Sequence, residues 1–401
     1  MPNQPHTYTA RWVWRGPGDL REGAAVVMQD GWIASVQDRP APGAAVTDLG
    51  EGLLLPGLVN AHTHLELSGM AGLARPEGDF VAWLEKLVAL RPDILRLNGA
   101  RATREAIEFL AGNGIALVGD ITNTGKAAAV LAEAGISAVS FYEALGAVLA
   151  EPPEAEVRWQ GPMLVGSAVA AHAPYSVPTE RLARLKARAG DLPFCMHLAE
   201  SMAEMEFIAG HGPQSERLHR FLAARGLRRE ELHLAANTPL GQVEAAHALD
   251  GATLLVHGVQ LSVDEVQRIA HAGASLCICP RSNLGLTKAI APVEALMAAG
   301  VNLALGTDSL ASAPDLSLWA EMAALASAKP GLAPEAILTM ATSGGAHALG
   351  QAGRFGALTP GAAGPLAFAP LKGVGRSEVI AAVVHGELAG EPVTVGRVVP
   401  E

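Results

Sequence analysis

The sequence is poor in charged residues, in aromatic residues and in cysteine. Asp, Glu, Lys and Arg make up 17% of its 401 residues, Phe, Trp and Tyr make up 4%, and there are only three cysteines. Cys195, Cys277 and Cys279 lie in apolar runs typical of buried strands, so we expect no structural disulfide. The net charge is −11 and the basic residues are scattered, which argues against a nucleic-acid-binding protein.

The sequence also lacks a long apolar run and an N-terminal signal pattern. The longest stretch without Asp, Glu, Lys or Arg covers residues 159–179, and Gly, Pro and His interrupt it. This composition indicates a buried strand and loop rather than a membrane span, although the mean hydropathy is +0.25. Residues 1–6 are polar, so we expect a cytoplasmic protein without a membrane partner. The high apolar fraction leaves room for a buried homodimer contact.

Short strand-like runs separated by turns occur at both ends of the chain. They cover residues 8–14, 24–28, 32–36 and 52–55, and after about Arg354 residues 365–370, 379–384 and 393–399. Because neither end can bury a face alone, we predict that they pack together as one small β-sandwich. Its N-terminal part is expected to span residues 1–56 and its C-terminal part residues 355–401.

Between these ends, over residues 57–354, apolar runs of strand length alternate with amphipathic helical stretches. Eight strand-then-helix units are typical of an α/β protein with a TIM-like (β/α)8 barrel. An open doubly wound sheet is the competing fold. Polar residues gather where the predicted strands end, and this placement favours the barrel, whose active sites lie at that edge.

Four histidines and an aspartate stand at these strand ends. His62 and His64 end the first predicted strand, His197 the fifth, His257 the sixth and Asp308 the eighth. Residues i and i+2 of a strand face the same side, so His62 and His64 can bind one metal ion together. His197 and Asp308 would complete a hydrolytic site with an open position for water, whose pKa the ion lowers to about 7. Asp308 can also accept a proton.

Each of these residues also has an ordinary structural explanation. A His-x-His pair can be incidental, a histidine in an apolar strand can belong to the core, and Asp308 can cap a turn or helix. Their joint occurrence at successive strand ends favours the site. Glu200 can act as an acid–base group that protonates a ring nitrogen, or be a carboxylate at a helix N-terminus. His257 can be a further metal ligand or polarise the attacking water from outside the ligand set.

The segments that carry these residues resemble the amidohydrolase superfamily, in the branch of the cytosine, guanine and adenosine-type deaminases and the triazine chlorohydrolases. They occur in the family's order over nearly the whole chain: LPGLVNAHTH at 55–64, HAPYSV at 172–177, HLAE at 197–200, VHG at 256–258, CPRSN at 279–283 and LGTDS at 305–309. The segment PGAAGPL at 360–366 departs from the family's usual PGKxADL, because it lacks both Lys and Asp. This departure puts the local strand geometry in doubt, and not the chemistry of the site.

The resemblance implies a role for each of these residues. The metal ligands are His62, His64, His197 and Asp308. Glu200 is implied as the proton shuttle, and His257 as the residue that orients the attacking hydroxide. Relatives with two metals carry a lysine at the end of strand four, where this chain has Ala171-His172. We therefore expect one divalent metal ion, with Zn²⁺ as the first expectation and Fe²⁺ as the alternative.

Four further residues are candidate contacts for a small-molecule substrate: Glu66, His172, Tyr175 and Arg281. Glu66 can hold ribose hydroxyls or an exocyclic amine, or be exposed without a role. Arg281 can pair with a carboxylate or form a salt bridge at the barrel rim. This set resembles the aminodeoxyfutalosine deaminases, whose substrate joins an adenine nucleoside to a benzoate. The resemblance implies hydrolytic loss of the adenine 6-amino group as ammonia, in menaquinone biosynthesis.

Three other functions fit the same scaffold. The chain can be another purine, pyrimidine or S-adenosylhomocysteine deaminase, or a chlorohydrolase that releases chloride instead of ammonia. A catalytically silent scaffold protein is the third alternative. Such proteins usually lose metal ligands, whereas every candidate ligand is in place here.

Overall fold

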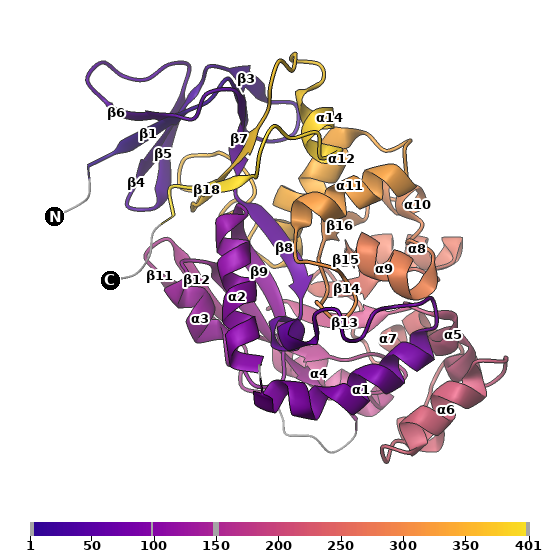
Figure 1. The fold of residues 1–401 in the computed structure, drawn as a ribbon. Coiled ribbons are helices and arrows are strands. Elements are labelled where there is room, and N and C mark those ends of the chain that lie inside the picture. The colour runs from indigo at the N-terminus through magenta and orange to yellow at the C-terminus, as the bar shows by residue number, and fades with distance from the viewer. Residues whose placement is uncertain (1–3, 98, 147–151, 398–401) are drawn as a thin grey trace.

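The structure, a computed structural model, describes residues 4–97, 99–146 and 152–397. Within these residues the strands form three sheets, a large one in the body of the molecule and two small ones at one end (Figure 1). In the same part of the chain, no helix has the length and apolar character needed to cross a membrane.

Eight parallel strands of the described chain form a nearly closed barrel. In spatial order they are β8 (Leu58–Thr63), β9 (Ile115–Thr122), β10 (Ser137–Ala144), β12 (Met163–Ala171), β13 (Phe194–Leu198), β14 (Thr253–His257), β15 (Ser275–Ile278) and β16 (Asn302–Leu305), and β11 (Glu156–Gln160) pairs with β12 outside this path. Near the carboxyl ends of β8 and β16, the amides of Thr307 and Asp308 donate to the carbonyl of His62 at 3.0 and 3.1 Å. The predicted (β/α)8 fold is confirmed.

The barrel strands are apolar because both of their faces are covered. All eight residues of β9, for example, are buried. The helices lie outside the strands, and capping residues mark where they begin and end. The helix α8 (Val263–Ala272) is an example. At its start, Ser262 Oγ accepts the amide of Glu265 at 3.3 Å, and the Glu265 carboxylate accepts the amide of Ser262 at 2.9 Å. Gly273, in the left-handed conformation, ends this helix.

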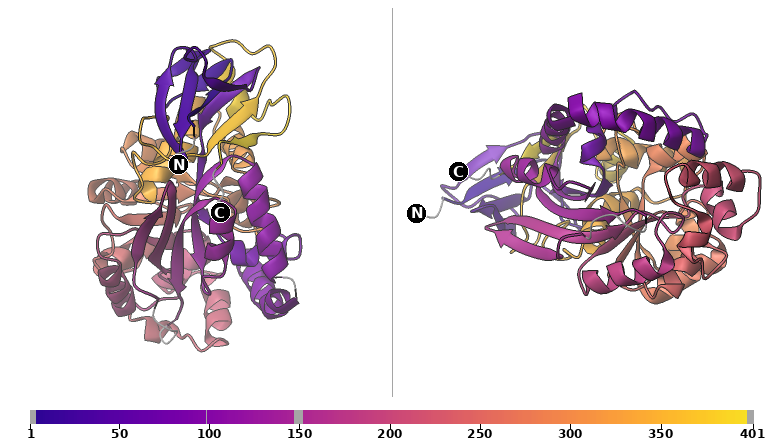
Figure 2. Two further views of the ribbon diagram at one scale, coloured as in Figure 1. Left: turned by 90° about the vertical axis from the view of Figure 1, so that its left-hand side faces the viewer. Right: turned by 90° about the horizontal axis from the view of Figure 1, so that it is seen from below.

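The other described helical segments surround the barrel or cover its mouth (Figures 1 and 2). They are η1 (Leu65–Met70), α1 (Phe80–Leu97), α2 (Gly99–Gly112), α3 (Ala127–Glu133), α4 (Thr179–Ala189), α5 (Met202–Ala209), α6 (Ser215–Ala223), η2 (Arg229–Leu232), α7 (Pro239–Ala245), α9 (Pro280–Thr287), α10 (Val293–Ala298), α11 (Leu318–Ala328), α12 (Pro334–Thr339), η3 (Met340–Gly344), α13 (Gly345–Ala348) and α14 (Val379–Val384).

The two ends of the chain form the small sheets, which lie together beside the barrel (Figure 2). One sheet holds β5 (Trp32–Gln37), β4 (Ala25–Gln29), β1 (His6–Thr9) and β6 (Ala45–Asp48), and the other β18 (Val393–Val395), β17 (Leu366–Pro370), β7 (Gly52–Pro56), β2 (Trp12–Trp14) and β3 (Leu20–Glu22). Val26 from the first sheet and Leu54 and Phe368 from the second share one apolar cluster. The predicted sandwich from both chain ends is confirmed, and its boundaries at residues 56 and 355 stay a prediction.

Two strand predictions at the chain ends were wrong in detail. Residues 379–384 form the helix α14 rather than a strand, because Val379, Ala382 and Val383 recur at helical spacing and are buried on one face. Residues 8–14 do not form one run, since β1 and β2 belong to different sheets. Of the predicted strand at 393–399, residues 393–395 form β18, and residues 398–399 lie outside the described residues.

Candidate active site

A cavity of about 510 Å³ lies where the barrel strands end, a size within the range of small-molecule sites. Its polar lining comes from strand ends and the loops that follow them, and includes His64, Glu66, Asn123, Glu143, His172, Tyr175, His197, Glu200, His257 and Asp308. Its apolar lining comes mainly from α1, α6 and the residues after α6, and includes Phe80, Trp83, Leu84, Leu87, Val88, Phe221, Leu222 and Leu227.

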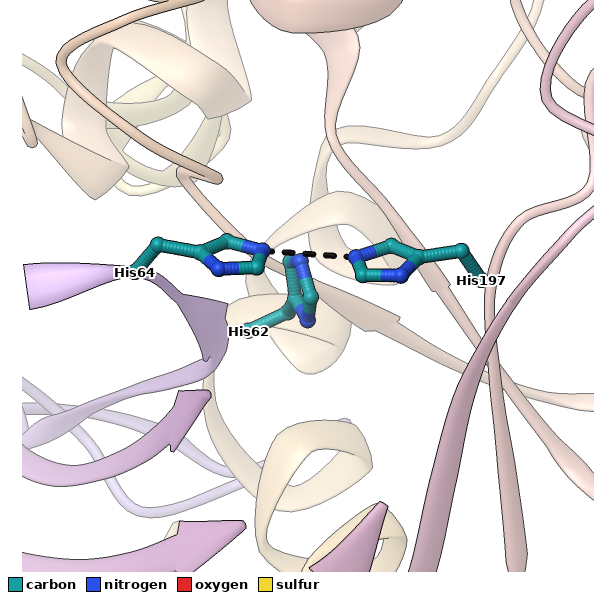
Figure 3. A group of neighbouring side chains, drawn as sticks. All are labelled: His62, His64 and His197. Carbon is teal, nitrogen blue, oxygen red and sulfur yellow. Dashed lines mark hydrogen bonds between the residues drawn. The ribbon is translucent and has the colours of Figure 1, made fainter. Parts of the chain in front are cut away.

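Three histidines gather at the polar end of this cavity (Figure 3). His62 lies near the end of β8, His64 just after it, and His197 on β13. Their candidate ligand nitrogens all lie within 4.8 Å of one another, and His64 Nε2 is 3.3 Å from His197 Nε2. Two ligands of one tetrahedral ion, each about 2.1 Å from it, are separated by about 3.4 Å. The spacing therefore suits a shared cation.

The hydrogen bonding of these rings also fits a metal site. His62 is fully buried, and both of its ring nitrogens lack a hydrogen-bond partner within the described residues. An unpartnered buried polar group costs about 1–3 kcal/mol, and a cation would supply the missing partner. Burial, followed by the neighbouring histidines, lowers the pKa of His62 well below its usual value and keeps the ring neutral, the form that binds metals. His197 Nδ1 donates to the carbonyl of His172 at 2.8 Å, so Nε2, which faces His64 Nε2, is the unprotonated nitrogen that can bind a cation.

Asp308 brings a carboxylate to the same place from the loop after β16. Its Oδ1 lies 3.8 Å from His62 Nε2 and 3.6 Å from His64 Nε2. Its Oδ2 accepts hydrogen bonds from the hydroxyls of Ser282 at 2.6 Å and Ser312 at 2.7 Å. Burial alone would raise the pKa of Asp308, but the nearby histidines and these hydroxyls hold it below its usual value. Its φ of 56° is unusual for a non-glycine residue and indicates a backbone held in place for the site.

Glu200 and His257 form the opposite side of the polar end. Glu200 Oε1 is 3.6 Å from His257 Nε2, and both groups lie close to Asp308. Burial, followed by the charges of Asp308 and Glu204, raises the pKa of Glu200 well above its usual value. A raised pKa favours the protonated form of this carboxyl group, the form that can donate a proton.

His257 is held in one orientation by a neighbouring amide. Asn283 Nδ2 donates to His257 Nδ1 at 2.9 Å, so the proton of the neutral ring is on Nε2, the nitrogen that faces Glu200. Burial lowers the pKa of His257 to about 3, so the ring is neutral. A protonated Nε2 is a hydrogen-bond donor rather than a metal ligand.

Three of the four predicted substrate residues line the cavity. The carboxylate of Glu66 accepts hydrogen bonds from Thr122 Oγ1 and from the amides of Asn123 at 3.2 Å and Thr124 at 2.9 Å. Burial would raise the pKa of Glu66, but these bonds hold it below its usual value. The rings of His172 and Tyr175 meet edge to face with their centroids 5.5 Å apart.

The fourth, Arg281, does not line the cavity. Its Nε pairs with Glu321 at 2.6 Å and its Nη2 with Asp315 at 2.9 Å. Nη2 also donates to the carbonyls of Asp315 and Ser317. The structure thus shows the salt bridge that was the alternative for this residue, and its position gives no support to a contact with substrate.

Several cavity residues were missed by the sequence analysis. Glu143, at the end of β10, lies within 4.8 Å of His172 and His197, and its Oε1 lacks a hydrogen-bond partner in the described chain. The apolar run that indicates this strand in the sequence covers residues 137–141 and ends just before Glu143. Arg91 on α1 and Arg225 after α6 also line the cavity, but no strand end or motif marks them.

A family model described as the amidohydrolase family matches residues 53–389 of this chain. The chain is 30% identical over 362 residues to the 5-methylthioadenosine/S-adenosylhomocysteine deaminase of Nitratidesulfovibrio vulgaris, a match that covers 83% of this chain and 76% of that protein. It is also 30% identical over 364 residues to the aminodeoxyfutalosine deaminase of Deinococcus radiodurans, and this match covers 84% of each.

Two solved structures share the fold over almost the whole chain. The Helicobacter pylori aminofutalosine deaminase, in complex with methylthio-coformycin, gives a TM-score of 0.82 at 25% identity and covers 97% of this chain and 100% of that chain. An adenosine deaminase from Xanthomonas campestris with bound zinc gives a TM-score of 0.78 at 25% identity and covers 99% of this chain and 94% of that chain.

Proposed function

Because the chain belongs to the amidohydrolase family and is a hydrolytic deaminase acting on C–N bonds, we propose that its substrate is a purine-type nucleoside with a 6-amino group. The best candidate is 6-aminodeoxyfutalosine, in the futalosine route of menaquinone biosynthesis. The observation that carries this proposal is the placement of the buried Glu200 beside the cluster of His62, His64, His197 and Asp308, at one end of a cavity that continues into an apolar part.

We assign one divalent metal ion to the cluster, with His62, His64, His197 and Asp308 as its ligands. The unpartnered nitrogens of His62 and the spacing of the other ligand atoms support this assignment. Zn²⁺ is the first candidate, because zinc accepts imidazole and carboxylate ligands and a structural relative is described with bound zinc. When bound, such an ion supplies Lewis acidity that lowers the pKa of water to about 7 and so provides a nucleophile at neutral pH.

The protein groups around the cluster can then move the protons that hydrolysis requires. Asp308, a carboxylate, accepts the proton of the attacking water, and His257 Nε2–H donates a hydrogen bond that orients the attacking oxygen. Glu200, whose pKa is raised by burial, donates a proton to the ring nitrogen next to the reacting carbon. A second proton transfer to the amino group lets ammonia leave, while the oxygen of water remains on the carbon.

Residues at the sides of the cavity would position the nucleoside. Three of the four hydrogen bonds to Glu66 reach Oε1, so Oε2 has room to accept a ribose hydroxyl. His172 lies beside His197, and Tyr175 lies beside His172; both line the cavity and can contact the base. Glu143, with its unpartnered oxygen, is a further candidate contact for a ring N–H or amino group.

The alternatives differ in the group attached at the 5′ position of the nucleoside or in the leaving group. One relative is named for 5-methylthioadenosine and S-adenosylhomocysteine and another for aminodeoxyfutalosine, at the same 30% identity. The apolar cavity lining from α1 and α6 suits a large, flat substituent, and this feature favours aminodeoxyfutalosine.

A substrate panel with ammonia and chloride detection tests this proposal. It compares aminodeoxyfutalosine, 5′-methylthioadenosine, S-adenosylhomocysteine, adenosine, guanine, cytosine and a chlorinated triazine. We expect ammonia release with the highest kcat/KM for aminodeoxyfutalosine. If aminodeoxyfutalosine were among the slow substrates, the assignment would be wrong, and chloride release would identify a chlorohydrolase.

A further inference from the structure

One arginine of the cavity lining has no carboxylate within ion-pair distance in the part of the chain that the structure describes. Arg225 follows α6, and its guanidinium carbon lies 3.7 Å from the centroid of the Phe221 ring. Its Nη1 donates to the carbonyl of Phe221 at 2.7 Å. Phe221, Leu222 and Leu227 line the same cavity, so the guanidinium lies against the apolar part of its lining.

Backbone hydrogen bonds hold the Cα of Arg225 in place. The amide of Arg225 donates to the carbonyl of Leu222 at 2.9 Å, and the amide of Leu227 donates to the same carbonyl at 3.1 Å. Gly226, with φ of 77°, makes the turn between them, and Leu227 is buried in the apolar cluster of α1, α5 and α6. A fixed, stacked guanidinium loses little conformational freedom when it binds an anion.

The Arg225 guanidinium contacts the ring and the carbonyl of Phe221, and neither is an acidic group. Among the described residues, no carboxylate lies within ion-pair distance of it. Two other arginines of the same region differ, because Arg217 pairs with Asp79 at 2.8 Å and Arg220 with Glu216 at 3.8 Å. Planar guanidinium groups with free N–H donors suit carboxylates.

Arg91, the other arginine of the cavity, has surroundings that disfavour an anion. It donates to the side-chain oxygen of Asn123. The side-chain Nδ2 of Asn123 donates to Glu143 Oε2 at 3.3 Å, and the backbone amide of Asn123 donates to Glu66 Oε2 at 3.2 Å. A bound carboxylate at Arg91 would therefore meet two further negative charges.

We propose that Arg225 determines substrate specificity by pairing with a carboxylate on the part of the substrate remote from the reacting ring. This inference rests on the proposed function and adds the chemical class of the substrate's far end. The apolar surface between the metal cluster and Arg225 takes an uncharged linking group, such as an aromatic ring. An α-amino acid end fits less well, because its ammonium would approach the Arg225 guanidinium without a described carboxylate nearby to pair with it.

A comparison of three adenine nucleosides tests this role. Aminodeoxyfutalosine carries the carboxylate, its methyl ester has the same skeleton without the charge, and S-adenosylhomocysteine carries both an ammonium and a carboxylate. For the unchanged protein we expect kcat/KM for the acid to exceed that for the ester by about tenfold, mainly through KM, as for a charge-assisted hydrogen bond. S-adenosylhomocysteine should also be slower than the acid.

Three variants separate recognition from a structural effect. Arg225→Ala should remove the preference for the acid, by lowering kcat/KM for the acid toward that for the ester. Arg225→Lys should keep part of the preference, because the charge remains while the planar fork is lost. Arg220→Ala, on α6 just before Arg225 but outside the cavity lining, is the matched control and should change kcat/KM for neither substrate.

The outcomes distinguish this inference from the function on which it rests. If the unchanged protein releases ammonia from these nucleosides but Arg225→Ala affects the acid and the ester equally, or neither, the specificity role is wrong and the deaminase proposal stands. If the metal-loaded protein releases ammonia from none of them, the nucleoside deaminase proposal fails, and the role of Arg225 fails with it.

Discussion

At the scale of single residues, the proposed proton transfer depends on Glu200 being buried and protonated. Replacing it by Gln keeps the volume and removes the acid, so Glu200→Gln should lower kcat by roughly 10²-fold or more while the metal content stays the same. Steady-state kinetics and metal analysis of the same preparation measure both. Glu216→Gln, at an exposed pair with Arg220, is the control and should be fully active. Full activity in Glu200→Gln would contradict the shuttle role.

The candidate ligands could be selected from the sequence because strand ends of a barrel converge. His62, His64, His197 and Asp308 all follow apolar runs, and the structure brings these groups together. The direction of a rim side chain depends instead on distant partners. Arg281 turns toward Glu321 and Asp315, whose positions the local pattern does not reveal. The arginines of the cavity lie on helices and loops over the barrel mouth, where no periodicity marks a cavity-facing residue.

At the scale of secondary-structure elements, the helix caps predict local stability that is separable from activity. Ser262 Oγ accepts the amide of Glu265 at the start of α8, outside the cavity lining. Ser262→Ala should destabilise the fold by about 1 kcal/mol and lower the midpoint of thermal denaturation, with kcat/KM unchanged. Ser262→Thr should restore most of the midpoint. An unchanged midpoint in Ser262→Ala would show that this cap contributes nothing.

Element type was predictable where a run was long or flanked by clear turns, as for β9, whose residues are buried on both faces. Short apolar runs were ambiguous. All six residues of 379–384 are apolar, and four of them are valine or isoleucine, which favour β-strands. They nevertheless form α14, because α11 and α12 offer an apolar surface to one face of the helix. That surface exists only in the folded molecule.

At the scale of the whole molecule, both chain ends are joined in one sheet, since β7 pairs with β17. Leu54 on β7 is fully buried opposite Phe368. Leu54→Ala should cost about 2–5 kcal/mol by leaving a cavity, and should lower the denaturation midpoint while the folded fraction keeps its kcat. Val46→Ala, at an exposed position of β6, is the control and should have little effect. A Leu54→Ala protein as stable as the unchanged one would contradict this account of the sandwich core.

The overall architecture was predictable because alternating strand and helix patterns leave few ways to bury every apolar face. The sequence did not predict that β1 and β2 belong to two different sheets, because this depends on the distant strands with which each one pairs. β1 pairs with β4 and β6, and β2 with β3 and β7.

The measurement that tests the central claim most directly is the metal content of the purified protein and of two histidine variants, after zinc has been supplied and unbound metal removed. The account predicts about one divalent ion per chain in the unchanged protein and in His219→Ala, whose ring lies outside the cluster, and far less than one in His62→Ala. A chain that binds no ion, or a His62→Ala variant that retains a full ion, would contradict it.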